Sequence, residues 1–425
     1  SDERRQYGTG SVHQRGSDGR WIGTVEAGWT AKGTRRRITV SAATEAEAKR
    51  KLRDKQRQIA REGIPDASAS ATETVKTYAE RWLRQREDRV RSKSWATDAS
   101  MVRAHIVPSI GHRKIGTLDV SAVRKVERDA AALSDSSLVR LRATLGKMLR
   151  DARQDGHPIP ERVLDVPRTG AGESDRDAMA EADLRDVVAV LALRPDRSRW
   201  LMALLYGERQ AECLGLTWDA VDFDAGVIDT SWQLQAVRYR HGCAGTCGHR
   251  FGGDCPSRVL HRKRGDQIRP LSGALCLVQP KTKAGKRVQP LLPAMEAALR
   301  EWRDVAPASP HGLVWPRADG RPARARDDDE AWRDILDTAR VAHVETDPAP
   351  HPGRVLDERG PCLVGRRYAI HEARHTVATL LRRTGTDEGT AAAILGQSKM
   401  LRRYVHVSPS DKAAALDPVA ALLGL

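Results

Sequence analysis

The sequence predicts an α+β protein that is mainly helical and carries small sheets in more than one domain. A chain of 425 residues is too long for one ordinary domain, so about two or three are expected. Residues 9–60 combine short strand patterns and turns with one helix, whereas residues 74–160 follow a helical period. The C-terminal half mixes helical stretches with strand patterns at residues 227–229, 275–278 and 288–291.

The overall charge indicates a nucleic-acid partner. A net charge of +16 and a pI of about 9.9 favour a polyanion, although such charge can also serve solubility alone. No run of about 18 apolar residues predicts a membrane span, and the charged N-terminus lacks an apolar signal region. Six cysteines do not make a disulfide framework in a chain of this length. We therefore expect a cytoplasmic protein without a membrane partner.

The first domain is expected over residues 1–62. Strands are predicted at residues 11–13, 20–26 and 35–40, with turn residues between them. Thr44 and Glu47 have the spacing of a capping box, which opens a helix to about Ile59. A small, polar, proline-marked linker follows at residues 63–73.

The second domain is expected over residues 74–160 as a helical bundle. A first helix contains the apolar period Val75, Tyr78, Ala79, Trp82 and Leu83. The next three are predicted at about residues 94–105, ending before Val107-Pro108, and at about residues 120–133 and 134–156. After a linker at residues 161–176, residues 177–425 form the third domain, with an unusual cysteine-rich insertion at residues 238–262.

A group of motifs in the third domain suits the attack of a phenol on a phosphodiester. His371-Glu372-Ala373-Arg374-His375 is followed by Leu395-Gly396-Gln397-Ser398 and then by Arg403-Tyr404-Val405-His406. Such an attack forms a phosphorane with two negative charges on its non-bridging oxygens, and arginine forks fit that geometry. The phenol of Tyr404, whose pKa is ordinarily about 10, must lose its proton while attacking.

Two upstream segments supply further cations. Arg209 stands three residues before Glu212, so the two share a helix face and the carboxylate could hold the guanidinium. Lys281 and Lys283 lie in a segment at residues 280–288 that reads as a β-hairpin tip. A lysine there could give a proton to the leaving oxygen.

Together these motifs resemble the tyrosine recombinases of the phage integrase type, close to integrases of actinobacterial mobile elements. Each motif is weak alone, but their order in the C-terminal half of a basic chain carries the resemblance. The matching pieces are Gly207-x-Arg209-x-x-Glu212-x-Leu214-Gly215-Leu216-x-Trp218, Pro280-Lys281-Thr282-Lys283, His371-x-x-Arg374-His375, Leu395-Gly396-x-Ser398 and Arg403-Tyr404-x-His406.

The resemblance implies a role for each matched residue. Tyr404 would be the nucleophile, forming a 3′-phosphotyrosyl bond and releasing a 5′-hydroxyl that a second strand can replace. Arg209 and Arg374 would clamp the non-bridging oxygens, with Glu212 in support. Lys281 would be the general acid, with Lys283 as its rival, and His371 would assist the phenol proton or the phosphate. No cofactor is expected for catalysis.

The resemblance also implies a nucleoid-associated location in a bacterial cell, and it implies the partners. Residues 1–62 would bind arm-type DNA sites, and residues 74–160 would clamp core sites opposite the catalytic domain. The expected contacts are Arg20, Trp21, Arg35 and Arg37 in the first domain and Lys93, Ser94, Arg113 and Lys147 in the second. Alternatively, Trp21 belongs to a small core and the charged residues are a solvated surface. We expect a homotetramer on double-stranded DNA and an excisionase or DNA-bending accessory protein. We also expect a C-terminal helix with an exposed apolar side that is exchanged between subunits.

Three departures from the family pattern leave alternatives open. Gln397 stands where the family usually has histidine or tryptophan. Six residues separate Gln397 from Tyr404, which is fewer than usual in the family. Glu208 replaces a small or apolar residue. A catalytically restrained architectural DNA-binding protein therefore stays an alternative. A type IB-like DNA relaxing enzyme, which shares the nucleophile chemistry, is another.

The insertion carries a separate pattern. Cys243, Cys247 and Cys255 lie close together, with histidines at positions 241, 249 and 261. Such a set could bind structural zinc, although the spacing is not that of paired Cys-x-x-Cys knuckles. The alternative is an exposed loop with reduced thiols.

Overall fold

A computed structural model of the chain describes residues 10–29, 35–62, 72–167, 178–280, 285–345, 362–397 and 407–425. The chain divides into two compact units, Ser1–Glu173 and Ser174–Leu425. Helices dominate and the sheets are small and antiparallel, so the predicted fold class is confirmed. Within the part of the chain that the structure describes, no helix has both the length and the apolar character needed to cross a membrane.

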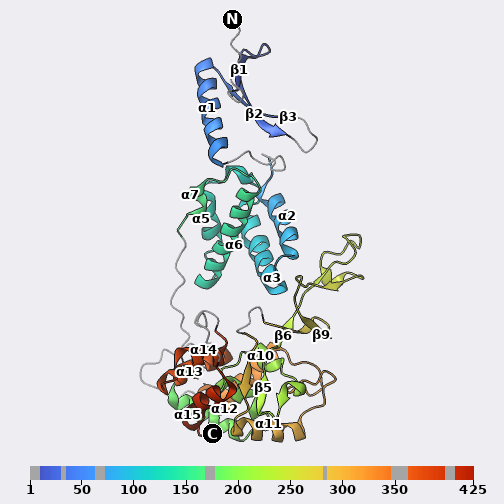
Figure 1. Ribbon diagram of the computed structural model, residues 1–425, viewed down its shortest axis with the longest axis vertical. Coiled ribbons are helices and arrows are strands. Elements are labelled where there is room, and N and C mark those ends of the chain that lie inside the picture. Colours follow the sequence, from blue (N-terminus) through green and yellow to red (C-terminus); the bar gives the residue numbers. More distant parts are fainter. Residues whose placement is uncertain are drawn as a thin grey trace. The chain divides into compact units, whose positions relative to one another are not determined.

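The N-terminal segment is a three-stranded antiparallel sheet with one helix against it (Figure 1). Its strands are β1 (Ser11–Gln14), β2 (Trp21–Trp29) and β3 (Arg35–Ala42), and α1 spans Glu45–Glu62. Gly23 allows β2 to lie close to β3 and α1, because a Cβ atom there would lie 2.9 Å from Val40 Cγ2 and 3.4 Å from Leu52 Cβ. The predicted strand and helix order is therefore observed.

The helical bundle has a continuous apolar core that includes Tyr78, Trp82, Leu145 and Met148. Asp119 caps one helix by accepting a hydrogen bond from the Ala122 backbone N–H at 3.0 Å. The elements are α2 (Val75–Glu87), α3 (Ser92–Met101), η1 (Val102–Ile106), α4 (Val107–Ile110), η2 (Ile115–Thr117), α5 (Val120–Asp129), α6 (Asp135–Gln154) and α7 (Glu161–Leu164).

The expected helix end before Val107-Pro108 is wrong. The helix continues through Pro108 to Ile110, because Val102–Ile106 widens into a π-helix in which the Val107 N–H bonds the Val102 carbonyl. Proline lacks an N–H and its ring would clash with the carbonyl four residues earlier in an α-helix. The wider turn relieves that clash, so the chain stays helical.

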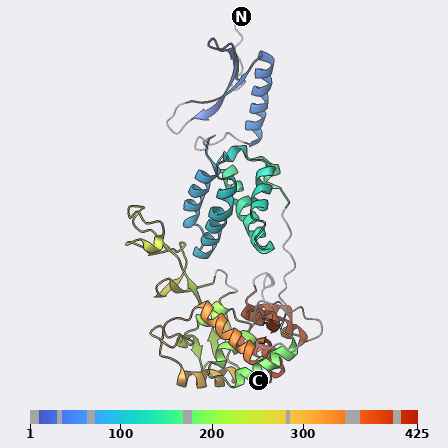
Figure 2. The same ribbon diagram turned by 180° about the vertical axis from the view of Figure 1, so that it is seen from behind.

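The C-terminal unit surrounds one large core. Trp200 and Trp332 stack in it with ring centroids 5.6 Å apart, and the Trp332 indole N–H donates to the Tyr368 carbonyl at 2.8 Å. Seen from behind, α12 lies on the near side of this unit beside α8 (Figure 2). Its helices are α8 (Glu181–Ala192), α9 (Arg197–Leu204), α10 (Gln210–Leu214), η3 (Trp218–Ala220), η4 (Gly252–Asp254), α11 (Pro293–Val305), α12 (Ala325–Thr338), α13 (Ile370–Arg383), α14 (Glu388–Leu395) and α15 (Pro409–Leu422).

Four small sheets complete this unit, and one strand pairing differs from the prediction. Strand β10 does not pair with β11: the turn at Gly273, with φ of +57°, gives it β9 as a local partner, and β11 pairs with β5. The sheet orders are β11-β5-β4, β6-β10-β9, β12-β13 and β7-β8. The strands are β4 (Val221–Asp222), β5 (Val227–Asp229), β6 (Gln233–Ala236), β7 (Tyr239–Arg240), β8 (Val259–Leu260), β9 (Ile268–Ser272), β10 (Leu275–Val278), β11 (Val288–Pro290), β12 (Ala342–Glu345) and β13 (Cys362–Gly365).

The C-terminal helix packs on its own C-terminal unit. In α15, Leu416 and Val419 are fully buried where the helix contacts α13, α14 and β11. The expected exposed apolar side is therefore largely wrong, since the exposed large apolar residues among 407–425 are Leu422 and Leu425, near the end of the helix. Burying this side within the same chain removes it from water without a partner subunit.

A buried ion pair connects α9 to α12. Arg199 donates from Nε and Nη2 to the two carboxylate oxygens of Asp328 at 2.9 and 2.6 Å, and both residues are buried. Gln210 adds a hydrogen bond to Asp328 at 2.9 Å. The pair thus fixes α12 beside the start of α10.

We expect Asp328→Ala to lower the free energy of unfolding by about 3–5 kcal/mol, because Arg199 would be left buried without its partner. Urea denaturation followed by far-UV circular dichroism measures the change. The matched control is Glu330→Ala on the same helix, whose exposed pair with Arg326 should contribute less than about 1 kcal/mol. Equal losses in the two variants would contradict the assignment.

Candidate active site

The turn between α9 and α10 places the first arginine. Gly207 has φ of +65°, and a Cβ atom there would lie 2.6 Å from Leu395 Cδ2 and 3.4 Å from Val377 Cβ. A larger residue would be strained and would clash, so glycine lets this turn lie directly against α13 and α14. Arg209 follows as the N-cap residue of α10.

Glu212, three residues into α10, orients Arg209. Its Oε1 accepts from Arg209 Nη1 at 2.7 Å and its Oε2 from the Arg209 backbone N–H at 2.8 Å. Burial works to raise the pKa of Glu212, but the hydrogen bond with Glu208 and the charges of Arg287 and Arg209 outweigh it and lower the pKa to about 2. A buried carboxylate therefore directs a guanidinium whose side chain is 38% exposed.

The second arginine, Arg374, lies on α13 and is nearly fully buried. Its Nη1 donates to the Gly207 carbonyl at 2.8 Å, and its Nη2 donates to the Leu395 carbonyl. Burial, and then the like charges of Arg209 and Arg287, lower its pKa to about 10, so it remains protonated at neutral pH. This side chain joins the turn before Arg209 to the end of α14 and brings the two predicted arginines together.

A third arginine, Arg287, is buried between Glu208 and Glu212. It donates to Glu208 Oε1 at 3.2 Å, to Glu208 Oε2, and to Glu212 Oε2 at 2.8 Å. Burial raises the pKa of Glu208 to about 7 despite the charge of Arg287. Sequence reasoning missed Arg287, but Glu208 was a signal, because an acidic residue beside a buried turn needs a basic partner.

Strand β11 extends this network to α14 and α15. Gln289 Nε2 donates to Glu208 Oε1 at 2.7 Å and to the Ile394 carbonyl at 2.8 Å. The buried Lys412 of α15 donates to the Val288 carbonyl at 2.6 Å. Burial, and then the charge of Arg287, lower the pKa of Lys412 to about 8. The network thus contacts both elements that flank residues 398–406.

His371 and Gln397 lie at the edge of this arrangement. His371 is exposed in the first turn of α13, and its ring meets His375 edge to face with centroids 5.5 Å apart. Gln397 is exposed and follows Gly396, whose left-handed conformation ends α14; its backbone N–H bonds the Ala392 carbonyl at 2.9 Å. Both side chains are exposed to solvent.

Tyr404, Lys281 and Lys283 lie outside the described residues. The structure therefore brings together Arg209, Glu212 and Arg374, and leaves the nucleophile and general acid as predictions.

The four candidates of the N-terminal sheet differ in their surroundings. Arg20 is exposed and donates to Ser41 Oγ at 3.0 Å, whereas Trp21 is half-buried at the start of β2. Arg37 is exposed and lies opposite Glu26 in the β2–β3 pairing. Arg35 opens β3, but its side chain lies outside what the structure describes.

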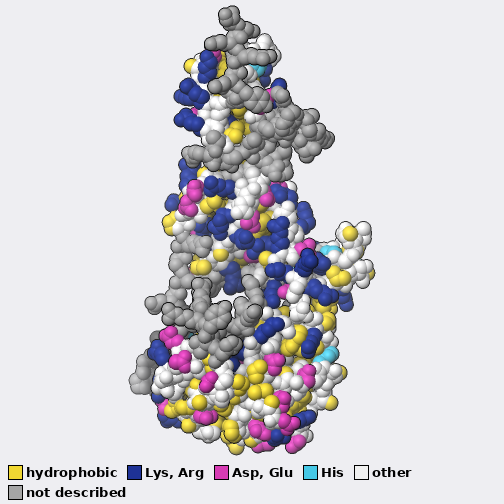
Figure 3. All heavy atoms as spheres, viewed as in Figure 1, with side chains coloured by type: hydrophobic (Ala, Val, Ile, Leu, Met, Phe, Trp, Pro, Cys, Tyr) yellow, Lys and Arg dark blue, Asp and Glu magenta, His cyan; other side chains and the backbone are white. Residues whose placement is uncertain are grey.

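The bundle candidates also differ. Lys93 and Ser94 are exposed at the start of α3. Many Lys and Arg side chains lie on the surface of the bundle (Figure 3). Lys93 lines a groove with Thr97, Ser137 and Arg140 that sequence reasoning did not identify. Arg113 instead pairs with Asp119 at 3.3 Å and Lys147 with Asp151 at 3.4 Å.

Comparisons with known proteins agree with this geometry. The family model of the phage integrase N-terminal SAM-like domain matches residues 74–127. An integrase of Saccharopolyspora erythraea is 22% identical over 373 residues, covering 78% of this chain and 79% of the relative. An integrase of Streptomyces ambofaciens is 27% identical over 223 residues, covering 52% of this chain and 56% of that relative.

Among solved structures, that of the Tn1549 transposon integrase with transposon right end DNA has a TM-score of 0.56 and 17% sequence identity. It covers 82% of this chain and 99% of the neighbour, which shows that the fold is shared. The chain is therefore similar to integrases of the tyrosine recombinase type in the order of its motifs, in its paired arginines and in its fold.

Proposed function

We propose that the chain is a site-specific DNA recombinase that integrates and excises a mobile element by breaking and rejoining DNA. The observation that carries the proposal is the joint placement of Arg209 and Arg374 by Gly207 and Glu212. Two guanidinium groups held by buried partners suit a phosphorane, because they need little rearrangement when negative charge develops.

Arg374 has donors to spare for a phosphate. Its hydrogen bonds to the carbonyls of Gly207 and Leu395 use two of the five N–H groups of a guanidinium. Arg209 similarly presents an exposed guanidinium while one Nη bonds Glu212. The two side chains would each bind a non-bridging oxygen of the scissile phosphate.

Tyr404 and a lysine would complete the reaction. The Tyr404 oxygen attacks phosphorus and loses its proton, aided by His371, while the bond from phosphorus to the 5′-oxygen breaks. Lys281, or its rival Lys283, gives that oxygen a proton. The 5′-hydroxyl of a second strand then attacks the 3′-phosphotyrosyl bond and frees Tyr404, so bond energy is conserved without a cofactor.

DNA is the proposed partner, in keeping with the charge of +16 and with the DNA-bound Tn1549 neighbour. Core sites would lie against Lys93, Ser94 and the groove residue Arg140, and arm sites against the exposed Arg20 and Arg37. Arg113 and Lys147 would contact the core-site DNA after their ion pairs with Asp119 and Asp151 break. Assembly as a tetramer with an accessory protein, and exchange of a C-terminal segment, extend the proposal.

The two alternatives predict different products. An architectural DNA-binding protein would bind without cleaving, in line with Gln397, which can donate a hydrogen bond but carries no proton to transfer. A type IB-like relaxing enzyme would cleave and reseal the same strand without joining strands of two duplexes.

A nicked suicide half-site from the element's own attachment region should trap a covalent adduct, because the released fragment leaves and religation stops. We expect a protein–DNA band on a denaturing gel without added divalent metal, mapping to Tyr404 and absent in Tyr404→Phe. Tight binding without an adduct would favour the architectural alternative. Relaxation of supercoiled DNA without strand exchange between two sites would favour the relaxing enzyme.

Glu212→Gln should slow adduct formation by about 10–100-fold, less than the loss of a direct donor to the oxyanion. The amide keeps the shape but loses the charge that orients Arg209. Single-turnover cleavage and half-site affinity are measured together, with Glu330→Gln as the matched surface control. A loss of affinity equal to the loss of rate would contradict an orienting role.

The buried acid pair should make stability depend on pH. Because the folded pKa of Glu208 is raised from its ordinary 4.5 to about 7, its favourable contribution is complete below pH 4.5 and is lost as the pH rises through 7. Glu208→Gln cannot ionise, so its unfolding free energy should fall less than that of the wild type between pH 5 and 8. Urea titrations at both pH values test this, and parallel losses would contradict it.

A further inference from the structure

The cysteine-rich insertion projects from β6 and β9 of the C-terminal unit (Figure 1), and it buries almost no apolar side chains of its own. Within residues 241–260, all of which the structure describes, Cys255 is the one buried residue, and Phe251 is 58% exposed. Two short strands, β7 and β8, close its base. Apolar burial this small does not offset the conformational entropy of ordering the loop, so another interaction must hold it.

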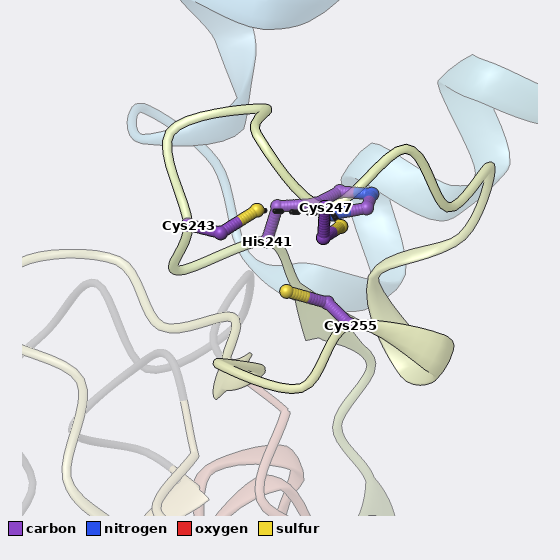
Figure 4. A group of neighbouring side chains, drawn as sticks. All are labelled: His241, Cys243, Cys247 and Cys255. Atoms are coloured by element: carbon purple, nitrogen blue, oxygen red, sulfur yellow. Dashed lines mark hydrogen bonds between the residues drawn. The ribbon is translucent and has the colours of Figure 1, made fainter.

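Four ligand atoms converge inside this loop (Figure 4). A ring nitrogen of His241 and the sulfurs of Cys243, Cys247 and Cys255 all lie within 4.8 Å of one another. The His241 Nδ1 is 3.9 Å from Cys243 Sγ and 3.3 Å from Cys247 Sγ. With Zn–S bonds of about 2.3 Å and Zn–N bonds of about 2.0 Å, a tetrahedral site needs ligand separations of roughly 3.5–3.8 Å.

The backbone is shaped to gather these side chains. Ala244 and Gly245 both have positive φ, at 52° and 90°, so the chain reverses between Cys243 and Cys247. The Thr246 N–H and hydroxyl both bond the Cys243 carbonyl, at 3.1 and 2.8 Å. A non-glycine residue in the left-handed region is strained, and such strain persists where the surroundings hold it.

A second close approach brings Cys255 to the group. A Cβ atom on Gly242 would lie 2.1 Å from the Ser257 carbonyl oxygen, so the strand leaving His241 and the turn after Cys255 touch backbone to backbone. The Arg258 N–H bonds the Cys255 carbonyl at 3.0 Å and closes that turn. Both ends of the loop therefore face one point.

We propose that His241, Cys243, Cys247 and Cys255 bind a zinc ion that folds the insertion. Three thiolates and one imidazole nitrogen are a ligand set that zinc favours, and four protein ligands leave no open position for a reacting water. The site is structural, and it stands independently of the recombinase chemistry.

Two other interpretations of the cluster explain fewer of its structural features. A disulfide would join two sulfurs and leave the third thiol and the imidazole without a reason to converge, and Cys243, Cys247 and Cys255 are free thiols in the structure. An exposed loop with reduced thiols would give no reason for the turn geometry.

The ion would give the chain a metal-dependent basic arm. Arg250, Arg258, Arg262, Lys263 and Arg264 are all exposed on or beside the insertion. Fixing them in one arrangement lowers the entropy lost when a polyanion binds. Metal loss should therefore disorder this arm while the catalytic core, which is built from other residues, remains folded.

Metal analysis of the full-length chain, purified without a histidine tag, tests the proposal. We expect one zinc per chain in the wild type and in His249→Gln, which removes an exposed histidine of the same loop that lies outside the cluster. Cys247→Ser and His241→Ala should lose most of the zinc. Cobalt exchanged into the wild type should give the intense visible bands of a tetrahedral thiolate site.

Limited trypsin digestion supplies a readout that needs neither activity nor DNA. Chelation, or Cys247→Ser, should speed cleavage at Arg250 and Arg258 several-fold and leave the far-UV spectrum nearly unchanged, and added zinc should protect the wild type again. Substoichiometric zinc with all thiols free, a disulfide within the cluster, or equal zinc in His249→Gln and Cys247→Ser would each overturn the proposal.

Discussion

A guanidinium buried between two carboxylates is the constraint on which the rest of the site depends. Arg287, Glu208 and Glu212 are all nearly inaccessible, and a charge removed from water is tolerated only when it is paired and hydrogen-bonded. Because Arg287 immediately precedes β11 and the two acids flank Arg209, satisfying these charges forces the strand against the turn that carries Arg209. Glu212 then has an oxygen available for Arg209, so one buried carboxylate serves both the fold and the site.

The first consequence is that the two arginines are held by different means. Arg209 is positioned by a charge, and its exposed guanidinium can adjust to a ligand. Arg374 is positioned by the backbone carbonyls of Gly207 and Leu395, which makes it a rigid part of the core. A phosphate entering between them would meet one fixed and one adjustable donor, which suits a group that changes geometry during reaction.

Much of this arrangement followed from local patterns in the sequence, and the remainder depended on contacts between distant residues. Arg209, Glu212 and Arg374 were found because motif spacing and the helical period encode short-range geometry. Arg287, Gln289 and Lys412 were missed because their partners lie 79, 105 and 124 positions away, where no periodicity signals a contact. The same limit explains the wrong β10–β11 pairing, since a local turn and a distant strand competed for β10. The helix continues through Pro108 because of a π-turn, and the presence of a proline alone does not predict such a turn.

Strand β11 gives the chain a way to coordinate the two segments that hold the proposed nucleophile and general acid. Residues 398–406, which contain Tyr404, are bounded by α14 and α15, and β11 bonds both: Gln289 contacts the Ile394 carbonyl and Val288 accepts from Lys412. The same strand follows the segment with Lys281 and Lys283. A shift of α15 would break the Lys412 bond and leave an amine buried without an acceptor, at a cost of about 1–3 kcal/mol. The position of the C-terminal helix is therefore coupled energetically to the strand beside the arginines, so any partner that displaces this helix would also act on the site.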